Sequence, residues 1–301
     1  MAKYLNPKAD LTFKKIFGLH KNLVMSLLNA LLPLPDGMEI QSVEYVTAEN
    51  IPNNPAKKYS IVDVKCIDNY KRQFIVEMQS YWTQEFFSRT VFNAAAAYSN
   101  QLKKGISFED LKDVYALSLI NEEAFCFNSD GEYIQEYYLI NKKHTEDIHT
   151  NLALIFVELP KFSPTNKGDK KMKDLWMKFL TQIDEHTREV DAELLENPEI
   201  KEALRIVEES AYTDAELAEY QKYWLDIITE RSAILGAEKR GIIKGREEGR
   251  LEGREEGRLE GRAEGEQHKA IEIARKLKVA GLDINTILQT TGLDLDVISN
   301  L

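Results

Sequence analysis

Apolar and polar residues follow a helical period at the start of the chain and a strand period soon afterwards. Residues 10–19, DLTFKKIFGL, predict a helix with Asp10 as its N-cap, and a second apolar helical run follows and ends before Pro33. Residues 40–49 predict a first strand. The stretch 58–82, KYSIVDVKCIDNYKRQFIVEMQSYW, predicts two more strands around a tight turn. The N-terminal region is therefore expected to fold as helices followed by three strands.

The period becomes helical again from Thr83, and Gly105 lies just beyond this segment as a stop signal. The apolar stripe of this helix is expected to consist of Phe87, Val91, Ala94, Ala95, Tyr98 and Leu102. Further strands are predicted at residues 113–121, 132–141 and 151–160. From Lys161 to about Ile234 the pattern is helical, with Pro198 in a first turn after Asn197 and Thr213 as another cap. Four apolar residues are expected to pack this helical part against the first domain, namely Leu175, Trp176, Phe179 and Leu180.

The hairpin within residues 58–82 carries a carboxylate near the middle of each strand. If the turn centres on Tyr70, Asp63 faces Glu77 on one side of the hairpin, whereas the other side is apolar. Like charges that oppose each other in this way are destabilising, and a hard divalent cation between them removes the conflict. Two alternatives stay open: a solvated polar face that Lys65 neutralises, and a bulge in the turn that leaves the acids diagonal.

A low-complexity segment, GIIKGREEGRLEGREEGRLEGRAEG, occupies residues 241–265 and has glycine at every fourth position. Each glycine costs a helix up to about 1 kcal/mol relative to alanine. The same period places like charges four residues apart, which is mildly repulsive in a helix. The pattern therefore favours a solvated tether over the alternative, a helix that self-associates through its glycines.

The C-terminal segment regains helical periodicity and resembles a helix-turn-helix module. Asp283 and Asp294 are predicted caps, and Gly281 and Gly292 are predicted turns between short helices. The last helix offers no arginine, lysine or glutamine to base edges, although such side chains usually read DNA sequence. A small protein-contact module is thus the favoured interpretation.

Bulk composition narrows the class of protein. The 301 residues carry a net charge of −11 and are 43% hydrophobic, which allows a sizeable core and argues against a protein that coats nucleic acid through bulk positive charge. No apolar run is long enough to span a bilayer, and the N-terminus lacks the apolar core of a signal peptide. Cys66 and Cys126 are interpreted as reduced core thiols. We therefore expect a cytoplasmic protein without membrane partners.

The segments DLTFKKIFG, KKYSIVDVKC, FIVEMQ and SRTVFNAAAAYSNQL, in this order, closely resemble the recombination-promoting nuclease (Rpn) and transposase branch of the PD-(D/E)XK superfamily. The Gly-Arg-Glu segment and the C-terminal tail resemble the same branch. The resemblance implies an α/β fold with a restriction-endonuclease-like core of order α-β-β-β-α-β, a mixed sheet flanked by helices, and a C-terminal helical region. It implies a nuclease-like core at 1–165, a helical extension at 166–235, a tether or helix at 236–266 and a small helical module at 267–301.

The same resemblance assigns candidate roles to individual residues. It implies that Asp63 and Glu77 are catalytic metal ligands, with the backbone carbonyl of Met78 as a third. Gln79 stands where the superfamily usually has lysine, and glutamine can hydrogen-bond the attacking water but cannot neutralise phosphate. Asp10 corresponds to an acid that often approaches the metal in such folds, and its alternative role is that of a plain N-cap.

The implied chemistry is metal-assisted hydrolysis of phosphodiester bonds with Mg²⁺, or Mn²⁺ as an alternative ion. Phosphate contacts are expected from Lys14 or Lys15, Lys65 and Arg89, with ordinary surface charge as the competing interpretation. The expected partner is double-stranded DNA, together with a second copy of the chain bound through the glycine-rich segment. Two other classes remain open: a nuclease-fold protein that binds DNA without cleaving it, and an interaction scaffold in which the tail carries the function.

Overall fold

The computed structural model describes residues 3–46, 64–103, 105–122, 132–163 and 171–301. The chain divides into two compact units, Met1–Ile227 and Ile228–Leu301, and the division falls inside a long helix. In chain order the elements are α1 (Asp10–Phe13), η1 (Lys14–Gly18), α2 (Lys21–Leu31), β1 (Val43–Tyr45), β2 (Val64–Asp68), β3 (Gln73–Gln79), α3 (Gln84–Ser99), η3 (Phe108–Asp110), β4 (Val114–Ile120), β5 (Ile134–Asn141), β6 (His144–Glu158), η4 (Leu159–Lys161), α4 (Lys171–Gln182), α5 (Ala192–Glu196), α6 (Pro198–Ile206), η5 (Glu209–Ala211), α7 (Asp214–Val279), α8 (Ile284–Thr291) and α9 (Leu295–Ser299).

The strands of the first unit form one mixed sheet in the order β1-β2-β3-β4-β6-β5. Strands β3, β4 and β6 are parallel, and the remaining neighbours pair antiparallel. Val64 pairs with Val76 and Cys66 with Phe74, which is the register that the sequence predicts for a turn centred on Tyr70. The described pairs of this hairpin show no bulge; Asp63 itself lies outside the described residues.

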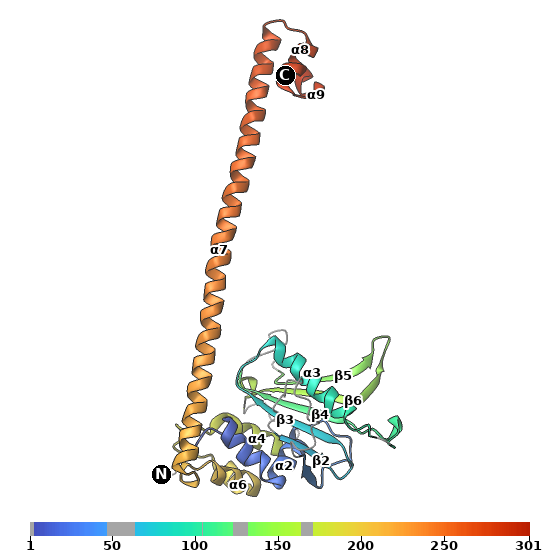
Figure 1. Cartoon of the computed structure of the whole chain (residues 1–301), viewed down its shortest axis with the longest axis vertical. Coiled ribbons are helices and arrows are strands. Elements are labelled where there is room, and N and C mark those ends of the chain that lie inside the picture. Colours follow the sequence, from blue (N-terminus) through green and yellow to red (C-terminus); the bar gives the residue numbers. More distant parts are fainter. Residues whose placement is uncertain (1–2, 47–63, 104, 123–131, 164–170) are drawn as a thin grey trace. The chain divides into compact units, whose positions relative to one another are not determined.

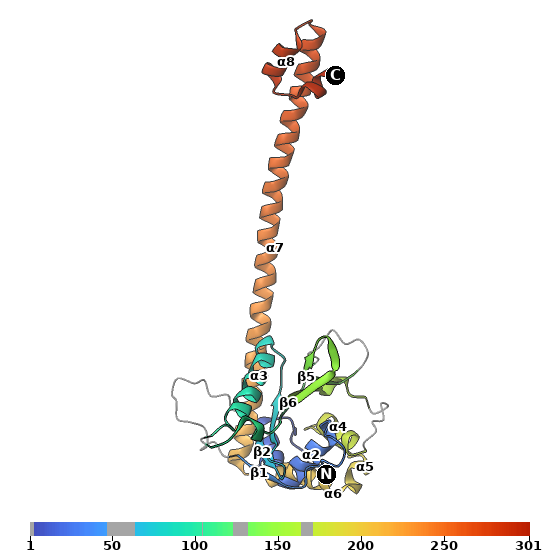
Figure 2. The ribbon, with the colours of Figure 1, turned by 90° about the vertical axis from the view of Figure 1, so that its right-hand side faces the viewer.

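Helices cover both faces of this sheet, as Figures 1 and 2 show. One face packs with α2, α4 and α6 into the larger apolar core, in which Trp176 of α4 contacts Phe17 and donates a hydrogen bond to Ser26. The expected packing of Leu175, Trp176, Phe179 and Leu180 against the first domain is confirmed. The other face is covered by α3 and forms a smaller core around Phe86 and Phe156. Burial on both faces explains why every residue of β4 is buried and all but Ser118 are hydrophobic.

Local signals placed several helix ends correctly. Asn197 caps α6 by accepting a hydrogen bond from the backbone of Ile200, and Pro198 opens that helix. Thr213 and Glu216 bond reciprocally at the start of α7, as a capping box requires. The predicted N-cap role of Asp10 is wrong, because Ala9 takes the cap position and the Asp10 carboxylate pairs instead with Lys14 at 2.7 Å.

The apolar stripe predicted for α3 is displaced by about one residue. Val91 is 40% exposed and Leu102 is 41% exposed, so neither belongs to the core. The side of α3 that faces the sheet consists of Phe86, Thr90, Asn93, Ala94 and Ala97, and the predicted core residue Tyr98 packs beside it while partly buried. The prediction was displaced because it selected only apolar positions, and this excluded the side of the helix that carries the polar residues Thr90 and Asn93.

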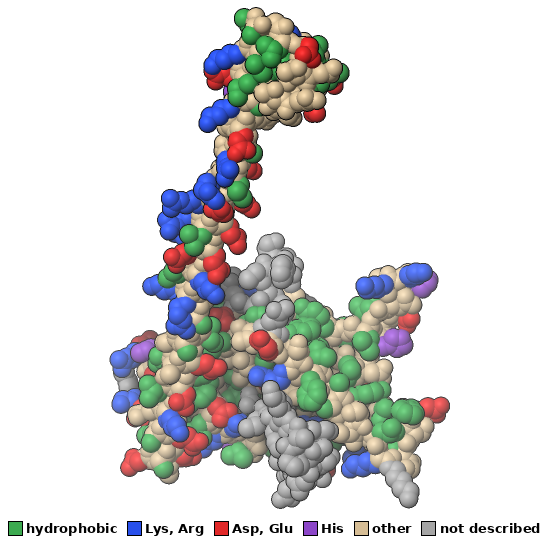
Figure 3. All heavy atoms as spheres, turned by 45° about the horizontal axis from the view of Figure 1, so that its top comes forward, with side chains coloured by type: hydrophobic (Ala, Val, Ile, Leu, Met, Phe, Trp, Pro, Cys, Tyr) green, Lys and Arg blue, Asp and Glu red, His purple; other side chains and the backbone are tan. Residues whose placement is uncertain are grey.

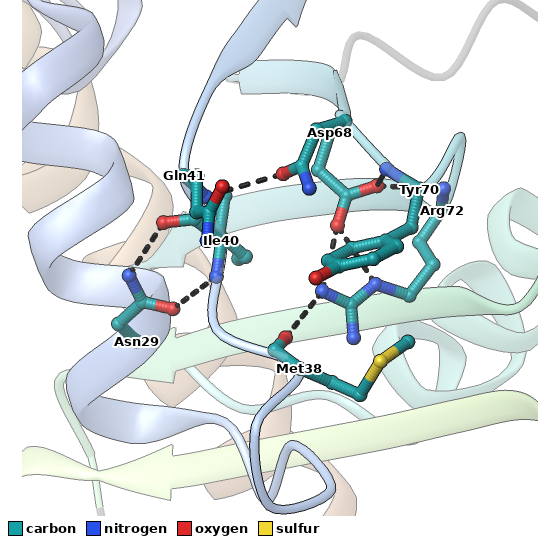
Figure 4. A network of polar contacts seen from close by, with 8 residues as sticks. Asn29, Met38, Ile40, Gln41, Asp68, Tyr70 and Arg72 are labelled. Atoms are coloured by element: carbon teal, nitrogen blue, oxygen red, sulfur yellow. Dashed lines mark hydrogen bonds and ion pairs between the residues drawn. The ribbon is translucent and has the colours of Figure 1, made fainter.

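The turn between β2 and β3 is fixed by a buried ion pair, shown in Figure 4. Arg72 and Asp68 are 4% and 3% exposed, and their side chains approach to 2.7 Å. The Asp68 carboxylate also accepts the backbone N–H groups of Tyr70 and Arg72, and Arg72 donates to the Met38 carbonyl. Lys71 adopts a left-handed backbone with φ of 66°. This network closes the turn and ties it to the segment that precedes β1.

The glycine-rich segment is helical throughout, so the prediction of a non-helical tether is wrong, whereas self-association through the glycines stays a prediction. The segment belongs to α7, which extends over 66 residues. Helix nucleation is the costly step, and this segment only propagates a helix that begins at the Thr213 cap. Pairs such as Arg262–Glu266 at 2.9 Å and Lys244–Glu248 at 3.6 Å add support along the exposed surface, where Figure 3 shows basic and acidic side chains interleaved.

The C-terminal module has the predicted short helices and turns. Gly281 and Gly292 adopt positive φ angles of 82° and 67°, and Asp283 accepts a hydrogen bond from the backbone of Thr286. Asp294 occupies the cap position of α9. Ala274, Ile287 and Ile298 form the small core of this module.

Composition predicts reduced core thiols and no membrane-spanning segment. Cys66 is buried among apolar residues, and burial raises the pKa of its thiol to about 12, which makes it unreactive. Cys126 lies outside the described residues. Across the part of the chain that is described, no helix combines the length and the apolar character needed to cross a membrane.

Candidate active site

The candidate site is built around Glu77 on the central strand β3. This carboxylate lies on the α3 side of the sheet and is 5% exposed. Asn93 of α3 is buried opposite it and donates a hydrogen bond from Nδ2 to Oε1 of Glu77 at 3.0 Å. An amide donor orients a carboxylate without cancelling its charge. Glu77 is thus held in one orientation by the helix that follows its own strand.

Gln79 lies two residues further along β3 on the same face, as predicted. Its Nε2 donates to the carbonyl of Tyr81 at 2.8 Å, and its Oε1 accepts from the guanidinium of Arg89 at 2.8 Å. The Arg89 guanidinium is 4.9 Å from the centre of the Phe86 ring. The structure therefore brings an arginine of α3 to the amide that stands where the superfamily usually has lysine.

Lys65 lies on β2 and pairs with Ile75, so it shares the sheet face of Glu77 and is diagonal to it. Its side chain is half-buried, and burial lowers its pKa because desolvation penalises the ammonium.

The candidate residues of the first helical segment pair with other charges. Lys14 and Asp10 form an ion pair, and Lys15 binds Glu216 at the start of α7 at 2.9 Å. Lys14 begins the π-helical turn η1, whose last residue, Gly18, lies against β2. The structure thus places the predicted acid and lysine of this segment together.

Two candidate oxygen ligands lie among the described residues, the Glu77 carboxylate and the Met78 carbonyl, and both are of a kind that binds a hard divalent ion. Gln73 donates its N–H to Asp113 and the Gln79 carbonyl accepts from Asn121, so the odd-numbered residues of β3 bond toward β4. Successive residues of a strand direct their backbone groups to opposite sides, which points the Met78 carbonyl toward β2. Carboxylate and carbonyl oxygens are the ligands that Mg²⁺ prefers. Among the described residues there is no cluster of three acidic, histidine or cysteine side chains, and Asp63, the second predicted carboxylate, lies outside them.

Sequence reasoning missed Asn93, although it holds Glu77. Asn93 stands seven residues after Phe86 and lies on the same side of the helix, but the predicted stripe, which starts at Phe87, left this side out. A polar side chain on a buried helix face requires a partner inside the protein. The histidines of β6, His144 and His149, are exposed beside Glu146 and Asp147.

An antiparallel hairpin with an acid on its second strand, a helix across it and a parallel strand define the class, a PD-(D/E)XK nuclease-type core. Residues 7–232 match the family model described as PD-(D/E)XK nuclease family transposase, and the chain belongs to this family. No curated protein and no solved structure matches the chain. The predicted family and fold class are therefore confirmed, and the family match supports a nuclease-type function.

Proposed function

We propose that the protein is a Mg²⁺-dependent endodeoxyribonuclease of the recombination-promoting type, with Mn²⁺ as an alternative ion. The observation that carries this proposal is the buried Glu77 carboxylate, held by Asn93 on the central strand of a nuclease-family fold. A buried carboxylate that is fixed in one orientation has the character of a preorganised ligand. The DNA substrate is expected to be double-stranded, and the protein is expected to act in the cytoplasm.

Asp63, Glu77 and the Met78 carbonyl would hold the ion, with Asp10 as a further candidate. When bound, such an ion lowers the pKa of a coordinated water and stabilises the charge that develops on phosphate. Gln79 would orient the attacking water, since its amide retains one N–H and one lone pair beyond the two hydrogen bonds described above.

Positive charge would reach the phosphate from neighbouring side chains rather than from Gln79. Arg89 is the best placed, because it is exposed and already bonded to Gln79. Its planar guanidinium can donate to Gln79 and to a phosphate oxygen at the same time. Lys65 and Lys14 are the other candidate phosphate ligands. The same glutamine favours the second candidate function, DNA binding with weak cleavage or none, because the usual lysine is replaced.

A plasmid-nicking assay with purified protein, with and without Mg²⁺, tests the proposal. Nicking should require the ion and should disappear in Asp63→Ala and in Glu77→Ala, and calorimetric titration with Mg²⁺ should lose its site in both variants. Glu44→Ala, which removes an exposed acid from the same sheet, is the matched control and should retain both. If the protein binds DNA without Mg²⁺ and does not nick it, the second candidate function, DNA binding without cleavage, is established instead. Equal Mg²⁺ binding by Asp63→Ala and the parent would contradict the metal assignment.

We also propose that a second copy of the chain binds along α7. From Arg246 to Arg262 an arginine follows the glycines, and a glutamate precedes them from Gly249 to Gly265. These residues therefore flank the glycines on opposite sides of the helix. In a parallel pair the arginine side of one copy faces the glutamate side of the other, as the e and g positions do in a coiled coil. An antiparallel pair would oppose like charges. Sedimentation analysis should give a dimer that dissociates at high salt; a monomer at all concentrations would exclude it.

A further inference from the structure

The turn that follows the candidate active-site strand is bonded to the first turns of α7. The hydroxyl groups of Ser80 and Tyr223 form a hydrogen bond of 2.9 Å across 143 residues of sequence. A longer bond of 3.5 Å runs from the Tyr81 hydroxyl to the carbonyl of Ile227. Both contacts lie within the first compact unit.

The same turn fixes the side chain of Gln79. The Tyr81 carbonyl accepts the Gln79 Nε2 hydrogen bond, and Ser80 is the residue between them. Trp82, next in the chain, donates its N–H to Glu122 beyond β4 at 2.8 Å. The orientation of the Gln79 amide therefore depends on where this short turn is held, and Tyr223 is one of its holding points.

The start of α7 is a fixed reference for such a contact. Thr213 caps the helix through its reciprocal bonds with Glu216, and Lys15 binds the same glutamate. The hydroxyl of Tyr220 accepts the backbone N–H of Asn6 at 2.8 Å and also binds Glu185. A helix anchored at several points cannot rotate freely, so a side chain that it presents keeps its place.

We propose that Tyr223 is a positioning residue, which acts through Ser80 to set the orientation of Gln79 in the active site. The catalytic consequence of this role rests on the proposed nuclease function. The family match, which extends to residue 232, includes the start of α7. The first turns of α7 thus belong to the same family-matched unit as the candidate active site.

Kinetic analysis of Tyr223→Phe tests the role, because this variant keeps the ring and removes only the hydroxyl. We expect kcat to fall about three- to tenfold with KM and the Mg²⁺ dependence unchanged, since misplacement of an orienting group slows the chemical step. Ser80→Ala should give the same loss, and the two losses should not add. In a Gln79→Ala background Tyr223→Phe should have no further effect on kcat. An equal loss in both backgrounds, or no loss in the parent, would overturn the proposal.

Tyr212→Phe is the matched control. Its hydroxyl is buried just before α7 and has no hydrogen-bond partner among the described residues, so its removal should leave kcat unchanged. A second measurement needs no activity: ¹⁵N-glutamine labelling should show the side-chain amide of Gln79 shifted in Tyr223→Phe and unshifted in Tyr212→Phe. If the parent does not cleave but this shift occurs, the nuclease function fails and the positioning role stands. An unshifted Gln79 amide in Tyr223→Phe would refute the positioning role.

Discussion

The two ends of the β2–β3 hairpin each bury an acid, but the two acids meet different partners. At the turn, Asp68 faces the guanidinium of Arg72 and two backbone N–H groups, as Figure 4 shows. At the other end, Glu77 accepts a hydrogen bond from the neutral amide of Asn93. Both carboxylates are at most 5% exposed, so burial alone does not distinguish them.

Asp68 thus stabilises the turn through an ion pair, whereas Glu77 is oriented by a neutral donor on α3. Asp68 and Arg72 balance each other, and removal of either leaves a buried charge without its partner. The bond from Asn93 fixes one oxygen of Glu77 and leaves its charge in place. A buried polar group is therefore better interpreted from the charge of its partner than from its burial. Four experiments would break or sharpen this comparison.

The largest effect is expected for Arg72→Met. This variant leaves the Asp68 carboxylate buried without its guanidinium, and we expect the free energy of unfolding to fall by about 3–5 kcal/mol. Urea denaturation measures it. The double variant Asp68→Asn/Arg72→Met should be more stable than the single one, because its amide oxygen still accepts the turn N–H groups and no charge is stranded. A single variant as stable as the parent would remove the distinction between the two ends.

Glu77→Gln should behave in the opposite way. The amide retains an oxygen that can accept from Asn93 and removes a buried negative charge, so stability should be unchanged or higher. Asp63→Asn should behave alike if the two acids repel without metal. Cleavage should fall about 100- to 1,000-fold, the scale of losing one electrostatic contact to the transition state. Paired urea and plasmid-nicking measurements check both effects. A large loss of stability would place Glu77 in the same structural role as Asp68.

Gln79→Ala should lower the cleavage rate by about 10- to 100-fold while Mg²⁺ affinity stays near the parent value, as expected of a group that orients water. Gln79→Lys should retain activity, since the wider superfamily has lysine at this position. Rate measurements at saturating DNA, combined with calorimetry, separate the two quantities. If Gln79→Ala cleaves as fast as the parent, the attacking water is not located on this face of the hairpin.

The smallest effect is expected from removal of the tail. A chain that ends at Ile234 keeps Tyr223, Ile227 and the whole first unit. It should therefore still nick DNA, with reduced efficiency. A loss confined to low protein concentration would indicate that the tail acts through self-association. If this chain folds, as circular dichroism would show, but nicks at no concentration, the tail is part of the catalytic machinery.

The sequence by itself determined the features that depend on neighbouring residues. The register of the hairpin follows from the alternation of side chains, because a shift by one residue would turn Val64, Cys66, Phe74 and Val76 out of the core. The caps at Asn197 and Thr213 were readable because a side-chain oxygen there meets an N–H only three residues away. The turns at Gly281 and Gly292 were readable because their positive φ favours glycine.

Only the tertiary structure decided which polar groups meet. Asn93 and Arg89 reach Glu77 and Gln79 because α3 crosses the sheet in one particular rotation, and the helical period left that rotation uncertain by about one residue. The bond between Ser80 and Tyr223 joins segments 143 residues apart, and no local pattern encodes such a pairing. Helix propensity also did not predict that α7 continues through its glycines. A helix that is already nucleated extends through residues that could not start one.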